Sequence, residues 1–141
     1  MATITEDYVS FETAKLLKEK GFNESCYTYY DDIDDSINRF DKGLHFSNTS
    51  YPWGVPYDIS KAKKYVVAPT LQMTIKWLRK KHNILLFLLP AQENGKLVYL
   101  AEVWTWNEGE GIYESTYASM PRKEPEQTIN AAIKHSLENL I

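Results

Sequence analysis

The sequence has little cysteine, no long apolar run and no strong excess of charge. Its one cysteine, Cys26, has no partner for a disulfide within the chain, so nothing indicates an oxidising compartment. The longest apolar run, Ile84 to Leu89, is far shorter than the roughly 20 residues of a membrane helix. The N-terminus lacks the basic and then apolar pattern of a signal peptide. We therefore expect a cytoplasmic protein that has no contact with a membrane.

Motifs for catalysis or cofactor binding are also missing. The chain has no nucleophile elbow, no glycine-rich phosphate loop and no pair of closely spaced cysteines. Its histidines, His45, His82 and His135, are too far apart in sequence to form a local metal-binding motif. We expect no catalytic residue and no cofactor, and an enzyme whose site is assembled across the fold stays an alternative without a named reaction.

An aspartate cluster resembles the start of a calcium-binding loop and then departs from it. Asp32 and Asp34 stand at alternate positions, as calcium ligands do. Ile37 then occupies the position that needs glycine, and Gly43 occupies the position of the bidentate glutamate. We interpret the cluster as a solvated acidic turn and predict no metal site.

Helix signals and strand signals alternate along the rest of the chain. Ser10 is a good N-cap and Gly21 a good terminator, which together predict a helix over residues 11–20. Apolar periodicity predicts two further helices, over residues 69–83 and 125–140. It also predicts three strands between them, over residues 84–89, 97–106 and 112–117. Short turns between the strands require antiparallel pairing. The predicted fold is α+β, a two-layer sandwich whose antiparallel three-stranded sheet lies in α-β-β-β-α order, with an extra N-terminal helix.

We expect a single domain over residues 1–141. It would consist of an N-terminal helix (1–22), an irregular aromatic and acidic segment (23–68) and the α-β-β-β-α core (69–141). Within the irregular segment the residues from Cys26 to Tyr30 suit a strand, and a short strand is expected near Lys64–Val67. Glycine and proline between residues 43 and 56 predict a loop.

Two helices cover one face of a three-stranded sheet, so the second face needs another cover. Trp104 and Trp106 are expected on that face. The N-terminal helix, the aromatic segment or a second copy of the chain can provide the cover. Tyr and Trp are enriched in protein interfaces. The residues we predict to contact a protein partner are Trp53, Tyr57, Trp104 and Trp106.

Charge is distributed unevenly along the chain. Residues 59–83 contain seven basic residues and no acidic residue, within a chain whose net charge is −3. The order of helices and strands is that of double-stranded-RNA-binding domains, which suggests a nucleic-acid-binding module as an alternative. The basic 61–81 region would then provide the contacts, with Lys76, Arg79, Lys80 and Lys81 as candidates. The lysine cluster that those domains carry at the start of the last helix is absent here.

Four blocks of sequence carry a resemblance to a known group. They read EDYVSFETAKLLKEKGF, CYTYYDDIDDSI, APTLQMTIKWLRKKHNI and AAIKHSLENLI, and cover about two fifths of the chain. Together they resemble short uncharacterised proteins encoded by phages and prophages of gut Bacteroidetes. The resemblance implies an origin in a mobile element, action in a bacterial host cell and binding to a host or phage protein. We therefore expect a non-catalytic protein-interaction module, with a homodimer through the second sheet face as a further option.

Overall fold

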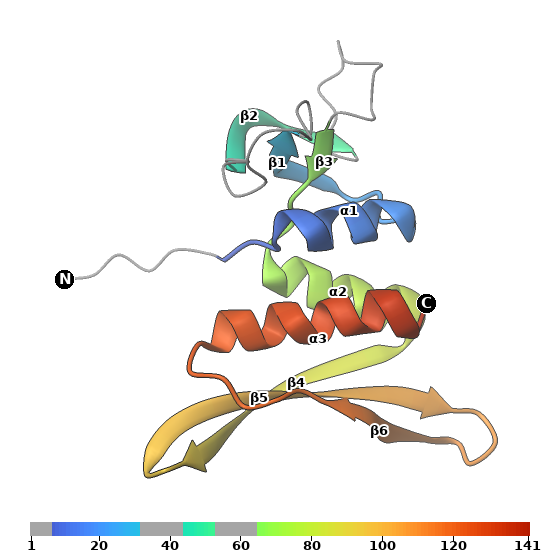
Figure 1. Ribbon diagram of the computed structural model, residues 1–141. Coiled ribbons are helices and arrows are strands. Elements are labelled where there is room, and N and C mark those ends of the chain that lie inside the picture. The colour runs from blue at the N-terminus through green and yellow to red at the C-terminus, as the bar shows by residue number, and fades with distance from the viewer. Residues whose placement is uncertain (1–6, 32–43, 53–64) are drawn as a thin grey trace. The chain divides into compact units, whose positions relative to one another are not determined.

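The computed structural model describes residues 7–31, 44–52 and 65–141 (Figure 1). Contacts along the chain divide it into two compact units, Met1–Thr70 and Leu71–Ile141. A compact unit is not by itself a domain that folds alone, so the single domain over residues 1–141 stays a prediction.

The first unit opens with helix α1 (Phe11–Glu19), which begins and ends where the local signals predict. The Oγ of Ser10 accepts a hydrogen bond from the backbone N–H of Thr13 at 3.3 Å, as an N-cap does. Gly21 has a φ of 91°, and the N–H of Phe22 returns to the carbonyl of Leu17. A residue with positive φ after the last turn stops the helix at little cost when it is glycine.

The first unit also contains a three-stranded sheet that the sequence analysis predicts only in part. Strand β1 (Ser25–Asp31) lies between β2 (Leu44–Pro52) and β3 (Tyr65–Val67), and both pairings are antiparallel. The short strand expected near Lys64–Val67 is β3. The residues from Cys26 to Tyr30, which suit a strand in sequence, lie in β1. The loop predicted between residues 43 and 56 is wrong for residues 44–52, which form β2. The polar stretch within β2 resembles a loop in sequence, and its pairing with β1 supplies the backbone hydrogen bonds that make it a strand.

Contacts between α1 and the strands hold the first unit together. The N–H of Val9 donates to the carbonyl of Pro69 at 3.1 Å, and the hydroxyl of Tyr30 donates to the carbonyl of Val9 at 2.7 Å. The ring of Tyr30 meets that of Phe11 edge to face at 5.7 Å. The hydroxyl of Thr28 donates to the carbonyl of Ala68. The chain entering α1 is therefore fixed to both β1 and the segment that follows β3.

The second unit has the predicted order of elements and confirms the α+β fold. A meander of three antiparallel strands, in the spatial order β4-β5-β6, stands between two helices. The elements are α2 (Leu71–His82), β4 (Ile84–Glu93), β5 (Lys96–Asn107), β6 (Ile112–Ala118) and α3 (Pro125–Asn139). Figure 1 shows α2 and α3 on one side of this sheet.

Strand β4 is longer than predicted because it does not end at Pro90. That residue pairs with Tyr99, and the ladder continues to Glu93 opposite Lys96. Since β4 is an edge strand of this sheet, its proline need not donate a hydrogen bond to a further strand. The Asn94-Gly95 turn then closes the hairpin with both residues at positive φ, the conformation that an Asn-Gly pair favours.

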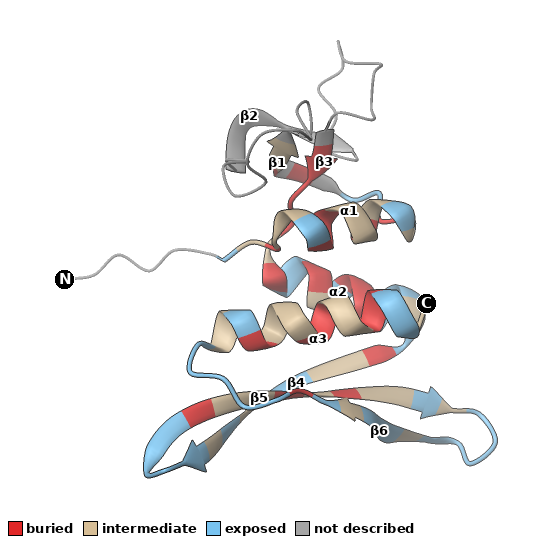
Figure 2. Ribbon diagram, in the orientation of Figure 1, coloured by how far each residue is buried: buried red, intermediate tan, exposed pale blue. Residues whose placement is uncertain are grey.

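The core of the second unit lies between the helices and one face of the sheet. On the sheet side Ala101 and Val103 of β5 are fully buried, and on the helices Leu78, Ile133 and Leu137 are fully buried. Figure 2 shows the buried residues concentrated on the helices and the middle of the sheet, with exposed residues at the two hairpin ends. The burial of α2 and α3 residues agrees with the predicted apolar stripes.

Replacing Leu78 by alanine tests this packing. The side chain is fully buried, so Leu78→Ala is expected to lower the free energy of unfolding by about 2–5 kcal/mol through lost apolar contacts and the cavity left behind. Leu97→Ala is the matched control, because Leu97 is 58% exposed and the same truncation should cost less than about 0.5 kcal/mol. Urea denaturation measures both values. A loss below about 1 kcal/mol for Leu78→Ala would show that α2 does not bury this face.

Candidate functional site

The side of the β4-β5-β6 sheet that faces away from α2 and α3 forms a continuous surface. Side chains alternate along a strand, and residues paired across strands lie on the same side. Leu85 pairs with Trp104, Phe87 with Glu102, and Trp106 with Tyr113. We define the open face as Leu85, Phe87, Leu89, Leu100, Glu102, Trp104, Trp106, Tyr113 and Ser115.

The open face is apolar and in contact with solvent. Phe87 is 46% exposed and Trp106 is 42% exposed, whereas Val103 on the helix side is fully buried. Trp104 and Glu102 are half-buried. Apolar side chains that gather on one exposed surface are typical of interaction sites, since a solvated patch of this kind is otherwise unfavourable.

Specific contacts hold the aromatic rings of the open face. The indole N–H of Trp104 donates to Oε2 of Glu102 at 2.9 Å. Phe87 meets Trp104 edge to face at a centroid distance of 6.3 Å, and Trp106 meets Tyr113 at 5.0 Å. Offset and edge-to-face pairs are the favourable arrangements of aromatic rings. These contacts hold the rings in defined orientations.

The middle of the open face is hollowed. A shallow hollow with a volume of about 430 Å³ lies over the centre of the sheet. Its lining consists of Leu85, Phe87, Leu89, Glu102, Trp104 and Tyr113. Glu102 is thus the one charged residue of a lining that is otherwise aromatic or aliphatic, and the lining surface is almost entirely apolar.

The structure places two of the four predicted partner-contact residues on the open face. Trp104 and Trp106 stand on β5, whereas Trp53 and Tyr57 lie outside the described residues. Sequence reasoning missed Phe87, Glu102 and Tyr113. Glu102 alternates with Trp104 and Trp106 along β5, so the sequence pattern could have placed it on the same side. Phe87 is assigned to this side only by the register between β4 and β5.

The alternative nucleic-acid contacts lie together on α2. Lys76, Arg79, Lys80 and Lys81 are all exposed. The first three share one stripe of the helix by their spacing, opposite the buried Thr74. We define Lys76, Arg79 and Lys80 as the basic stripe.

His82 does not extend the positive charge of α2. Burial lowers the pKa of His82 below its usual value, because desolvation disfavours the charged imidazole. Its ring meets that of Trp77 edge to face at 4.7 Å. The imidazole is therefore neutral at neutral pH and packs as an aromatic group.

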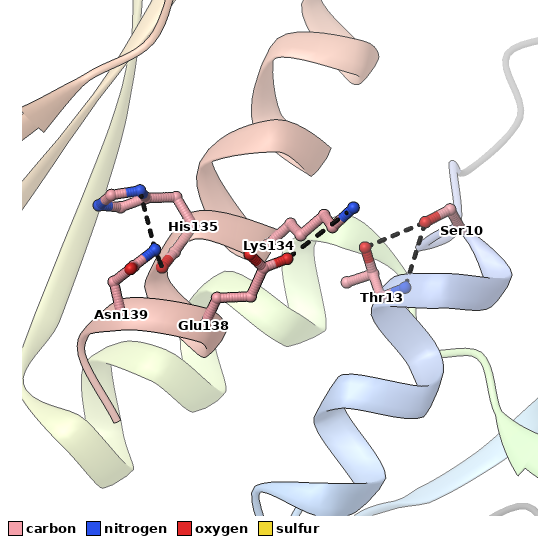
Figure 3. Close-up of polar contacts among 6 residues, drawn as sticks. All are labelled: Ser10, Thr13, Lys134, His135, Glu138 and Asn139. Atoms are coloured by element: carbon pink, nitrogen blue, oxygen red, sulfur yellow. Dashed lines mark hydrogen bonds and ion pairs between the residues drawn. The ribbon is translucent and has the colours of Figure 1, made fainter.

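The other histidine of the second unit, His135, also has a packing role. Its ring stacks on Tyr117 at 3.7 Å, with 10° between the planes. Figure 3 shows the amide of Asn139 reaching His135, where it donates to the backbone carbonyl at 3.1 Å. Lys134 and Glu138 form an ion pair one turn apart at 3.8 Å, with both side chains largely solvated. Such exposed pairs contribute little to stability.

Cys26 is unsuited to nucleophilic chemistry. It is buried, and its thiol lies 3.7 Å from the backbone carbonyl of Glu24. Burial, and to a lesser extent the charge of Glu24, raise the pKa of Cys26 to about 11. The thiolate is the reactive form, so this thiol is largely inert at neutral pH.

The described residues contain no group of three or more potential metal ligands among His, Cys, Asp and Glu. The predicted acidic turn at Asp32 and Asp34 lies outside those residues. In the part of the chain that the structure covers, no helix is both long enough and apolar enough to cross a membrane.

Comparison with known proteins adds no relative. No protein-family model matches the chain, and searches of curated proteins and of solved structures find no similar protein.

The buried thiol predicts a specific loss of stability at alkaline pH. The pKa of Cys26 is 9.0 in an unfolded chain and about 11 in the folded one. The unfolded state therefore releases its proton first, and rising pH favours unfolding throughout this window. Between pH 8.5 and pH 11 the wild type should lose about 1–3 kcal/mol more than Cys26→Ala does. Urea denaturation at several pH values measures the difference, and parallel curves for both proteins would contradict the prediction.

Proposed function

We propose that the protein is a non-catalytic interaction module that binds another protein through the open face. The observation that carries the proposal is the exposure of Phe87 and Trp106 on an ordered apolar surface with Trp104 between them. Binding energy in interfaces is typically concentrated on a few aromatic anchors surrounded by well-packed neighbours. Aromatic rings already held in place lose little conformational freedom on binding.

The size of the open face suits a peptide segment or a small interface. The open face runs over residues 85–89, 100–106 and 113–115, and at about 3.3 Å per residue and about 4.8 Å between strands this gives a footprint of roughly 240 Å². A standard stable interface buries about 800 Å² on each partner. An extended or helical segment fills such a strip, whereas a homodimer through this face alone would be small.

The resemblance of four sequence blocks to phage and prophage proteins supports the choice of partner. We propose an accessory role in a bacterial host cell, with a host or phage protein as the partner. A second copy of the chain on the same face is the competing occupant.

Substitutions on the open face test the proposal. Phe87→Ser together with Trp106→Ser removes both exposed anchors, and is expected to reduce capture of the partner from lysates of lysogenic bacteria at least tenfold. Met120→Ser is the control, since Met120 is also exposed but lies outside the open face. Quantitative mass spectrometry of proteins retained by tagged versions of all three gives the ratio. Equal retention by the double variant and the control would contradict the proposal, and a sedimentation measurement detects the homodimer.

Nucleic-acid binding is the second candidate function, because the basic stripe and Lys81 present four exposed cations on one helix. Contacts with phosphates release counterions, so affinity for duplex RNA or DNA should fall steeply with salt. An aromatic contact with a protein should respond weakly.

A titration of labelled duplexes separates the two functions. The open-face proposal predicts weak duplex binding at 150 mM salt, and a change of less than threefold when Lys76, Arg79, Lys80 and Lys81 all become alanine. Tight binding at 50 mM salt that falls more than tenfold at 200 mM, and disappears in the fourfold variant, would favour the nucleic-acid function instead. Fluorescence anisotropy measures both affinities.

A further inference from the structure

We infer that the hollow in the open face binds the cationic side chain of a lysine or arginine on a partner protein segment. This inference rests on the proposed function and adds the chemistry of the partner. Its basis is the lining of the hollow, in which Glu102 is the one charged residue among aromatic and aliphatic residues, and the hydrogen bond that holds the Glu102 carboxylate at the indole of Trp104.

The carboxylate of Glu102 has the position and the free capacity for such a ligand. It stands on the central strand β5, directly opposite Phe87 in the register. Its Oε2 accepts one hydrogen bond from Trp104. Within residues 7–31, 44–52 and 65–141 no lysine or arginine forms an ion pair with it. An ionised carboxylate can accept about four hydrogen bonds, so most of its capacity is available to a donor.

The aromatic lining adds a second attraction for a cation. Phe87, Trp104 and Tyr113 all border the hollow. A cation within about 6 Å of an aromatic face is attracted by the electrons of the ring, and Trp is the strongest such partner. The hydrogen bond to Glu102 and the contact with Phe87 orient Trp104 in advance.

The leucines that line the hollow suit the hydrocarbon part of a bound lysine or arginine side chain. Leu85 and Leu89 both lie on β4, on the same side of the strand, and both border the hollow. Lysine and arginine have long hydrocarbon stems that bury along apolar surface while the charged end reaches a polar group. A residue with a short stem or a negative charge gains neither contact. Phosphate groups would meet the carboxylate, so the hollow also disfavours a nucleic-acid backbone.

Short peptides in an NMR titration test the inference. The probe is the capped pentapeptide Gly-Leu-Arg-Leu-Gly, and its matched controls carry Gln or Glu in place of Arg. The signal is the indole N–H of Trp104, which reports directly on the hollow. We expect the Arg peptide to bind the wild type at least tenfold more tightly than the Gln peptide and to shift this signal, while the Glu peptide binds most weakly.

Two variants separate charge from folding. Glu102→Gln keeps an oxygen to accept the indole N–H of Trp104 and removes the charge, so the tenfold preference for Arg should disappear. Glu114→Gln removes the same charge from the opposite side of the sheet, where Glu114 pairs with Thr105, and should leave the preference intact. A preference for Arg that survives Glu102→Gln would overturn the inference.

The remaining outcomes distinguish this inference from the proposed function. The Arg and Gln peptides could bind the wild type equally, and both could lose binding in the double variant Phe87→Ser with Trp106→Ser. That result would overturn the cation site and support an apolar docking surface. Absence of binding by every peptide would also overturn the cation site. The capture experiment with the same double variant then decides the proposed function independently.

Discussion

The structure of the second unit depends on one constraint: two helices cover only one face of a three-stranded sheet. The residues of β5 divide accordingly, with Ala101 and Val103 buried on the helix side and Trp104 and Trp106 on the other. Burial on the helix side supplies the hydrophobic stabilisation that the meander needs, since isolated strands are marginal in water. The opposite face is left with large rings that are not required for this packing. The proposed role of this face as a contact surface accounts for its composition.

The open face combines features that a purely structural surface does not need. The hydrogen bond from Trp104 to Glu102 fixes an indole ring and a carboxylate within an apolar surround. Phe87 and Trp106 extend the surface toward opposite hairpins of the meander, while α2 keeps its cations on its own exposed stripe. The exposed aromatic rings and the exposed cations thus lie on two different surfaces of the same unit. This separation is why the two candidate functions respond differently to salt and to substitution.

Local signals explain what the sequence predicts well, and pairing between distant residues explains what it misses. Ser10 and Gly21 determine the ends of α1 through neighbouring backbone groups, so the helix is readable from the sequence. Strand β2 cannot be recognised in the sequence, because its pairing with β1 joins segments far apart in the chain. The alternation within β5 places Trp104 and Trp106 on one face, as expected. The unbroken apolar run of β4 carries no such alternation, so only the register with Glu102 reveals Phe87 as part of the candidate site.

Hydroxyl-radical footprinting of the protein in solution tests the central claim, that the open face is a solvent-facing surface, most directly. Phe87 and Trp106 are exposed, whereas Trp77 on α2 is buried. The account predicts that mass spectrometry will find rapid oxidation of Trp106 and Phe87 and slow oxidation of Trp77, at concentrations where the protein is monomeric. Equal protection of Trp106 and Trp77 under those conditions would show that the chain itself covers the open face, and would contradict its role as a contact surface.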